Sequence, residues 1–151
     1  MIETRPLFDI TLQVPQVLDI GETPLGRRRI APVTGGEFHG ERLRGTVVGA
    51  PAGDWLLQRR DGTTVLDVRL LLRTDDGEHI YMSYRGVRHG PPEVMARLAA
   101  GESVDPKAYY FRIAPVFETA AKKYAWINKV LAVGIGRREP TGPIYAIAEV
   151  L

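Results

Sequence analysis

The stretch TTVLDVRLLLRTDDGEHIYMSYRGVR, residues 63–88, decides the fold. Leucine and valine stand at alternate positions 66, 68, 70 and 72, with charged residues at 67, 69 and 73 between and after them. This alternation is typical of a β-strand with one buried face, because successive side chains of a strand point to opposite sides. The Asp-Gly pair at positions 76 and 77 suits a tight hairpin, since both residues tolerate positive φ. The stretch therefore predicts two antiparallel strands, Thr63–Thr74 and Glu78–Arg88, joined by a turn.

Similar alternation recurs along the rest of the chain and predicts about nine strands in all. The other runs are residues 8–14, 28–33, 42–48, 54–60, 109–118, 124–135 and 144–151. One helix is predicted in PPEVMARLAAG, residues 91–101, because proline favours the first helical turn and glycine follows the last. Two placements are open for this helix, across one mouth of a barrel or against its outer wall.

Many strands with regular turns and one short helix predict an all-β fold, either a sandwich or a closed barrel. We favour a single antiparallel β-barrel of about eight to ten strands, because the strands are long and closure removes edges that invite aggregation. A barrel of this size either fills its interior with side chains or holds one small ligand. We expect one domain over residues 1–151, since a chain of this length can bury a core of its own.

The composition excludes several classes of protein. The chain has no cysteine, which excludes disulfides, thiolate nucleophiles and cysteine metal sites. Its 44% hydrophobic and 25% charged residues are close to the averages for soluble globular proteins, and no apolar run is long enough to span a bilayer. The first residues lack the apolar core of a signal peptide, so we expect a cytoplasmic protein with no membrane partner. The 20 basic and 18 acidic residues are mixed along the chain, so we expect no nucleic-acid partner.

No motif calls for a metal or a cofactor. His39, His79 and His89 stand far apart and lack the spacing of a metal site. The segment GIG at positions 134–136 lacks the third glycine and the βαβ context of a dinucleotide fingerprint. The chain has two serines, Ser83 and Ser103, and neither lies in a nucleophile elbow, so covalent acyl transfer is not expected. We therefore expect a protein that works without a cofactor.

Four spaced motifs resemble a bacterial and fungal family catalogued as domain of unknown function 3237. They are GGEFHGERLRGTVVG at 35–49, GDWLLQRRDG at 53–62, LDVRLLLRTDDGEHIYMSYRGVR at 66–88 and YYFRIAPVFETAAKKYAWINK at 109–129. The resemblance covers about Leu7 to Leu151 and implies a lipocalin-like, single-domain antiparallel β-barrel, but no settled activity. The recurring family positions that match are Gly36, Gly40, Gly45, Asp54, Trp55, Asp61, Gly62, Arg69, Asp76, Gly77, Tyr110, Arg112, Phe117, Glu118, Trp126 and Asn128.

A polar strand face in the last of these motifs is the candidate ligand site. Tyr110, Arg112 and Glu118 point to one side of the predicted strand, and mostly apolar residues point to the other. In one interpretation the polar face is the outer surface of a barrel with an apolar interior. In the other it lines a cavity, which we favour because tyrosine, tryptophan and asparagine beside a lone arginine are typical of an enclosed site. Trp126 and Asn128, on the next predicted strand, belong to the same set.

The chemistry that these residues suggest is proton transfer. Glu118 or Asp54 would act as general acid or base with a pKa raised by burial, and Tyr110 would donate to a carbonyl oxygen. Arg112 would bind a carboxylate, phenolate or enolate. Arg69 would serve equally well in a structural ion pair with a neighbouring aspartate. The remaining ligand-binding candidates are Asn128, Trp126, Arg69, Tyr81 and Trp55.

This apparatus suits a cofactor-free lyase, isomerase, hydratase or cyclase acting on a small aromatic or enone-like molecule. The alternative is a carrier or sensor that binds a small apolar acid without changing it, since binding and catalysis need the same walls. A third alternative is a fully packed barrel that works through protein contacts. The edges of an incompletely closed barrel would also allow pairing across a homodimer.

Overall fold

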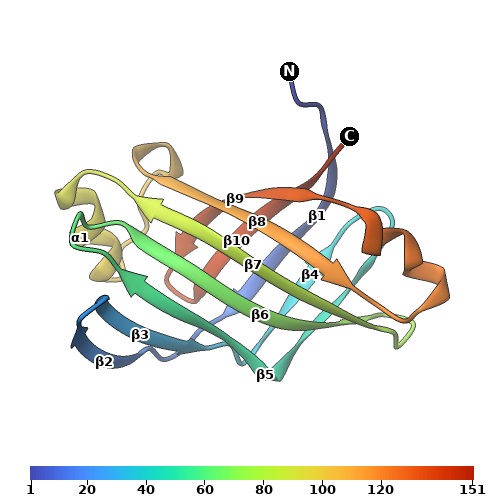
Figure 1. Ribbon diagram of the computed structural model, residues 1–151, viewed down its shortest axis with the longest axis horizontal. Coiled ribbons are helices and arrows are strands. Elements are labelled where there is room, and N and C mark those ends of the chain that lie inside the picture. Colours follow the sequence, from blue (N-terminus) through green and yellow to red (C-terminus); the bar gives the residue numbers. More distant parts are fainter.

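Eight strands close into an antiparallel barrel, and a hairpin extends the sheet at one end (Figure 1). The computed structural model describes residues 1–151. The elements in chain order are β1 (Thr4–Gln13), β2 (Leu18–Thr23), β3 (Gly26–Pro32), β4 (Gly35–His39), β5 (Arg44–Gln58), β6 (Thr64–Thr74), β7 (His79–His89), α1 (Pro92–Ala99), η1 (Pro106–Ala108), β8 (Tyr110–Glu118), η2 (Lys122–Lys129), β9 (Ala132–Glu139) and β10 (Gly142–Val150). The ring runs β5, β6, β7, β8, β9, β10, β1, β4 and back to β5. The predicted all-β barrel is confirmed.

Strands β6 and β7 bury the apolar residues that alternate along them. Positions 66, 68, 70 and 72 of β6, and 80 and 82 of β7, are each at most 2% exposed and belong to the core. The two strands form the predicted hairpin, in which Arg73 lies opposite His79. Burying one large aliphatic side chain contributes about 1.5–3 kcal/mol, so these inward rows supply much of the stability of the barrel.

Strand β5 changes partner halfway along its length. Its first half pairs with β4, where Gly45 lies opposite Phe38, and its second half pairs with β3, where Leu56 lies opposite Arg29. β6 follows both halves, with one shift of register. β2 pairs only with β3, so these two strands form a hairpin beside the ring. Figure 1 shows this hairpin and α1 at the same end of the barrel.

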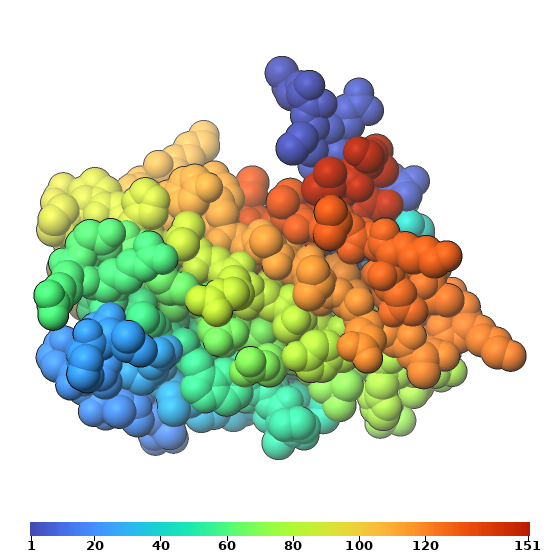
Figure 2. Space-filling model, in the orientation of Figure 1, coloured from blue at the N-terminus to red at the C-terminus, as the bar shows by residue number.

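The two chain ends lie together, away from α1. The backbone N–H of Leu151 donates to the carbonyl oxygen of Glu3 at 2.9 Å. Figure 2 shows the N-terminal residues projecting from the body of the protein beside the C-terminal ones. None of the helices has the length and apolar character needed to cross a membrane.

The predicted strand over residues 124–135 is wrong in its first half, which forms the 3-10 helix η2. The buried side chains of η2 are Tyr124 and Ile127, three positions apart. In a 3-10 helix residues i and i+3 share a face, whereas a strand would have buried every second residue. β9 begins only at Ala132. The 3-10 helix η2 is therefore a helical segment, besides the predicted helix α1, that alternation did not reveal.

Three further differences concern short or bent strands. β2 was not predicted because most of its residues are exposed, so it carries no alternation. β4 was not predicted because it opens with two glycines, which usually mark a turn. The predicted strands 42–48 and 54–60 are one continuous strand, β5, whose GAPAG segment resembles a loop in sequence.

Candidate functional site

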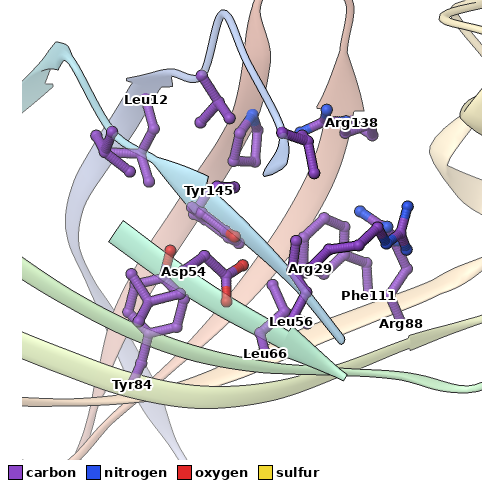
Figure 3. A pocket seen from close by; sticks show the side chains of 16 residues that line it. Leu12, Arg29, Asp54, Leu56, Leu66, Tyr84, Arg88, Phe111, Arg138 and Tyr145 are labelled. Carbon is purple, nitrogen blue, oxygen red and sulfur yellow. The ribbon is translucent and has the colours of Figure 1, made fainter. Parts of the chain in front are cut away.

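An enclosed cavity of about 60 Å³ lies inside the barrel, near the end where α1 sits (Figure 3). Strands from almost the whole circumference contribute to its wall, which is mainly apolar. The exceptions are one carboxyl group, two phenols and three guanidinium groups, belonging to Asp54, Tyr84, Tyr145, Arg29, Arg88 and Arg138. A few polar groups converging between apolar walls are characteristic of ligand-binding sites.

Asp54 is the only carboxylate in the lining. Asp54 and Leu56 both point into the barrel from β5, and the Asp54 side chain is buried, with the residue 9% exposed. The backbone N–H of Asp67 on the neighbouring strand donates to its Oδ1 at 3.1 Å. Burial raises the pKa of Asp54 from 3.8 to about 6, and the hydrogen bond from Asp67 and the charge of Arg88 oppose that rise. Near neutral pH this carboxyl group can therefore both accept and return a proton.

Tyr84 on β7 and Tyr145 on β10 lie on either side of Asp54 in Figure 3. Their rings meet edge to face, with centroids 5.4 Å apart. Both side chains are buried, and neither hydroxyl group has a hydrogen-bond partner in the protein. Burial raises the pKa of both phenols above the usual value, so at neutral pH each is a protonated donor. Buried polar groups normally have partners, so two free hydroxyls facing one cavity indicate that a ligand supplies them.

Three arginines from three strands converge at one side of the cavity. They are Arg29 on β3, Arg88 on β7 and Arg138 on β9, and none forms an ion pair with a carboxylate. Arg88 lies over the ring of Phe111, 5.4 Å from its centroid, and Figure 3 shows the Arg29 and Arg88 groups close together there. Burial lowers the pKa of Arg88 and of Arg138 below the usual value of an arginine. The cluster therefore concentrates positive charge in a partly buried place.

A second, larger chamber of about 300 Å³ adjoins the first and is covered by α1. The helix contributes Met95 and Leu98 to its wall. Both chambers are lined by the three arginines and Val17, so the arginines lie at the neck between the two. Of the two placements predicted for the helix, the structure shows the first, across one mouth of the barrel.

Gly136 on β9 makes room for the aromatic wall of the cavity. A Cβ atom at this position would lie 2.8 Å from Cγ of Phe111 and 2.9 Å from Cε1 of Tyr145. The rings of Phe111 and Tyr145 pack edge to face, with centroids 5.3 Å apart. Any larger residue would displace these two rings, so the position of the Tyr145 hydroxyl depends on this glycine.

The favoured interpretation of the polar face of β8 is wrong, because that face is the outside of the barrel. Tyr110 is 44% exposed and Glu118 is also exposed, whereas the opposite face, which carries Phe111 and Ile113, is buried in the core. Arg112 lies over the ring of Tyr110, 4.7 Å from its centroid, and donates to a backbone carbonyl. Alternation assigns the residues of β8 to the correct two faces, but it does not say which face is inside. The face with the larger apolar residues lies in the interior, because burying apolar surface is favourable.

The other predicted ligand-binding residues also lie outside the cavity. Trp55 and Tyr81 are 36% and 40% exposed, and Arg69 lies over the Trp55 ring, 5.4 Å from its centroid, without an ion pair to Asp54. Trp126 on η2 stacks against Arg42 at 4.1 Å. η2 is at the opposite end of the barrel from α1 (Figure 1).

Asn128 closes a local loop. Its amide oxygen accepts from the backbone N–H of Thr119 at 2.7 Å, and its amide nitrogen donates to the Thr119 carbonyl at 3.0 Å.

Of the nine predicted site residues, only Asp54 lines the cavity. Its catalytic role stays a prediction.

Sequence reasoning missed the two phenols and the three arginines, although a signal for them exists. On β7, Tyr84 and Arg88 follow the same inward phase as Ile80 and Met82. On β10, Tyr145 shares the phase of Ile147. The pattern that marks this site is therefore a single polar residue within an otherwise apolar, inward-facing row of a strand. The polar rows themselves face outward.

The titratable residues form no metal cluster. No group of three or more His, Asp or Glu side chains lies close enough to hold a metal ion. His39 lies beside Glu37 on the surface, and the ring of His89 stacks on Tyr110 at 5.0 Å.

Known proteins share this fold and much of this sequence. A UPF0311 protein of Rhodopseudomonas palustris is 38% identical over 151 residues, covering 99% of this chain and 97% of the relative. The crystal structure of a β-barrel-like protein from Acinetobacter baumannii matches with a TM-score of 0.87 and 38% identity, covering 100% of this chain and 97% of the other.

A more distant structural match comes from a fungus. The crystal structure of an enzyme from Penicillium herquei matches with a TM-score of 0.73 and 20% identity, covering 99% of this chain and 95% of the other. At this identity the match shows a shared fold. The model of the family described as "Protein of unknown function (DUF3237)" matches residues 2–150, in agreement with the resemblance seen in the motifs. The chain therefore belongs to the DUF3237 family.

Proposed function

We propose that this protein binds a small molecule in the barrel and acts on it as a cofactor-independent acid–base enzyme. The reaction class is that of a lyase, isomerase, hydratase or cyclase, and the substrate is a small aromatic or enone-like compound. One observation carries the proposal: the carboxyl group of Asp54, with its pKa raised to about 6, shares a cavity with two buried phenol hydroxyls that have no partner.

The chemistry follows from what these groups can donate and accept. The Asp54 carboxylate would take a proton from a carbon or hydroxyl group activated by a carbonyl, and the same carboxyl group would return the proton at another position. Tyr84 and Tyr145 would donate hydrogen bonds to the carbonyl oxygen, where negative charge develops. The positive field of the three arginines would stabilise that charge further in a site of low polarity. In an isomerisation or cyclisation the proton and the electron pair stay within the reacting molecule. In a lyase or hydratase reaction the electron pair leaves with the departing group or comes from the added water, and Asp54 transfers the matching proton, so none of these reactions needs an oxidant or reductant.

The fungal structure described as an enzyme supports this proposal at the level of the fold. A fold of this kind hosts different functions, so the weight rests on the site. The mainly apolar wall favours one alternative, a carrier or sensor that holds a small apolar acid without converting it. The same arginines would then bind the acid, and Asp54 would have no reaction to catalyse.

Incubation with panels of phenolic acids and enones tests the proposal. Conversion is followed by mass spectrometry, and binding is followed by calorimetry. We expect Asp54→Asn to abolish turnover and keep binding, because the amide preserves shape and loses the basic oxygen. Glu118→Gln is the matched control, since Glu118 lies on the outer face and its replacement should leave turnover unchanged. Ligands that bind to wild type and are never converted would favour the carrier, and turnover that survives in Asp54→Asn would contradict the assigned role.

A further inference from the structure

The charges at the neck between the two chambers are unbalanced. Arg29, Arg88 and Arg138 line both chambers, and Asp54 is the only acidic side chain in either wall. No arginine of the three has an ion-pair partner, and burial together with the charges of neighbouring arginines lowers the pKa of Arg88 and of Arg138. Charges held in a desolvated place are stabilised by a counter-charge of opposite sign. The protein itself provides fewer negative groups than the neck requires.

The hydrogen-bonding capacity of the neck is also unused. The Nε–H of Arg29 is fully buried and has no acceptor. In the adjoining inner chamber, the buried hydroxyls of Tyr84 and Tyr145 lack partners too. Arginine presents its N–H groups in a planar fork that matches the two oxygens of a carboxylate or phosphate. An oxyanion at the neck would therefore balance the positive charge and accept from the free Nε–H of Arg29.

The sizes of the two chambers decide how a ligand lies. A cavity that holds benzene has a volume of about 150 Å³, so an aromatic ring does not fit into the inner chamber of about 60 Å³. The outer chamber of about 300 Å³ under α1 can hold one. The inner chamber has room for a small group such as a carbonyl or hydroxyl, next to Asp54 and the two phenols. The body of the ligand then lies under Met95 and Leu98.

We infer that the ligand of this protein carries an oxyanion, a carboxylate or phosphate, within a few bonds of its reacting group, and that Arg29, Arg88 and Arg138 bind this oxyanion at the neck. The inference rests on the proposed function only in taking this cavity as the ligand site. It narrows the substrate class from aromatic or enone-like compounds to their small anionic members. Neutral compounds of the same shape lack the group that the neck requires.

Calorimetric titration of the full chain with three probes tests the inference. Benzoate and phenyl phosphate carry the two candidate oxyanions on the same ring, and benzamide is a neutral counterpart of benzoate. We expect at least one anion to bind at least tenfold more tightly than benzamide, and the tighter anion identifies the preferred group. Benzamide binding as tightly as both anions, or no binding of either anion at millimolar concentration, would overturn the inference.

Two neighbouring arginines provide a matched pair of variants. Arg138 lines the neck, whereas Arg137 points outward and pairs with Glu139 at 3.5 Å. Arg138→Met should weaken binding of the preferred anion at least tenfold and leave benzamide unchanged, while Arg137→Met should bind like wild type. Circular dichroism and thermal melting establish that each variant is folded, and Arg29→Met serves as a second variant if Arg138→Met is not. Equal anion affinity in the folded neck variant and in Arg137→Met would contradict the assignment.

The titration and the turnover assay can fail separately. Anion binding that depends on Arg138, together with no conversion of any anionic compound, would leave the inference standing and contradict the enzyme. Conversion of neutral and anionic compounds with equal efficiency, abolished by Asp54→Asn, would leave the enzyme standing and overturn the inference.

Discussion

Tyr84 and Tyr145 meet edge to face in the barrel interior, with ring centroids 5.4 Å apart and an interplanar angle of 69°, although they come from strands β7 and β10. Their hydroxyl groups are buried without partners. An unpartnered buried hydroxyl costs stability, so the presence of two such hydroxyls on neighbouring rings is best explained by what they do for a bound molecule.

Removing either hydroxyl should therefore reduce activity more than stability. We expect the free energy of unfolding of Tyr84→Phe and of Tyr145→Phe to lie within about 1 kcal/mol of the wild-type value, because neither hydroxyl forms a hydrogen bond in the protein. Turnover of any identified substrate should fall by about 10² or more, since a donor to the carbonyl oxygen is missing. Urea denaturation and steady-state kinetics measure the two effects.

The matched control is Tyr124→Phe, whose hydroxyl group donates to Oδ1 of Asp76 at 2.8 Å at the other end of the barrel. This variant should lose stability and keep its activity. A Tyr84→Phe variant with full turnover would remove Tyr84 from the proposed mechanism.

Asp54 should make the protein less stable as pH rises through the weakly acidic range. Its pKa is about 6 in the folded protein against 3.8 ordinarily, so the folded state holds the proton more tightly than the unfolded state. The free energy of unfolding should fall between about pH 4 and pH 6, by roughly 3 kcal/mol for a shift of about two pKa units. Asp54→Asn removes this effect, so the variant should be more stable than wild type above pH 6 and similar to it at pH 4.

Urea denaturation of both proteins at several pH values gives the difference that belongs to Asp54 alone. The other groups facing it, Tyr84, Tyr145, Arg88 and Arg138, keep their protons throughout this range. Stability curves that run parallel for wild type and variant would contradict the raised pKa.

Gly136→Ala should disturb the aromatic wall of the cavity. The new methyl group would lie within 3.0 Å of the buried rings of Phe111 and Tyr145. Overpacking of this kind costs about 1–3 kcal/mol, and it displaces the ring that carries the Tyr145 hydroxyl. Gly53→Ala is the control, because a Cβ there has no neighbour closer than 3.4 Å. Thermal melting and ligand titration should separate the two variants, and equal melting temperatures would argue against the close packing at Gly136.

Asp76→Asn should lower the melting temperature through loss of a connection between the β6–β7 turn and η2. Asp76 accepts hydrogen bonds from Thr74 at 2.5 Å, Lys123 at 2.7 Å and Tyr124 at 2.8 Å, and these bonds hold its pKa well below the usual range. Because the folded-state pKa is depressed, the stabilisation is complete above about pH 4 and is lost as pH falls further. The difference in melting temperature between wild type and variant should shrink in acid.

Asp75→Asn is the neighbouring control for this substitution, since the exposed Asp75 side chain makes no hydrogen bond. A drop of equal size in both variants would mean that the turn itself, and not its contact with η2, is affected.

The barrel could be predicted from local pattern, whereas the site depends on long-range pairing. The alternation at positions 66–72 marks an inward row without any knowledge of partners, because strand geometry alone sets it. Alternation does not say which face is inside when one carries Phe111 and Ile113 and the other carries Tyr110 and Arg112. The residue types on the polar face suggested a pocket, but burial of the larger apolar area decided the orientation.

Asp54, one of the two candidate acid–base residues, lines the cavity, whereas its neighbours there could not be predicted from the sequence. Tyr84 and Tyr145 are more than sixty positions apart, and they meet only because β10 closes the ring through β1 and β4 while β7 lies across the interior. No local pattern encodes that closure. Arg29 was still harder to place, because β3 joins the wall through the second half of β5 alone.

The partner change along β5 separates closure of the ring from attachment of the β2–β3 hairpin. Closure of the ring uses β4 and the first half of β5, whereas the β2–β3 hairpin, which carries Arg29, is attached beside it. Because the hairpin is not part of the hydrogen-bonded ring, we expect changes of length or sequence near its turn, residues 21–28, to alter the wall around Arg29 without opening the barrel. Libraries confined to that segment are the natural starting point for redirecting this scaffold to new ligands.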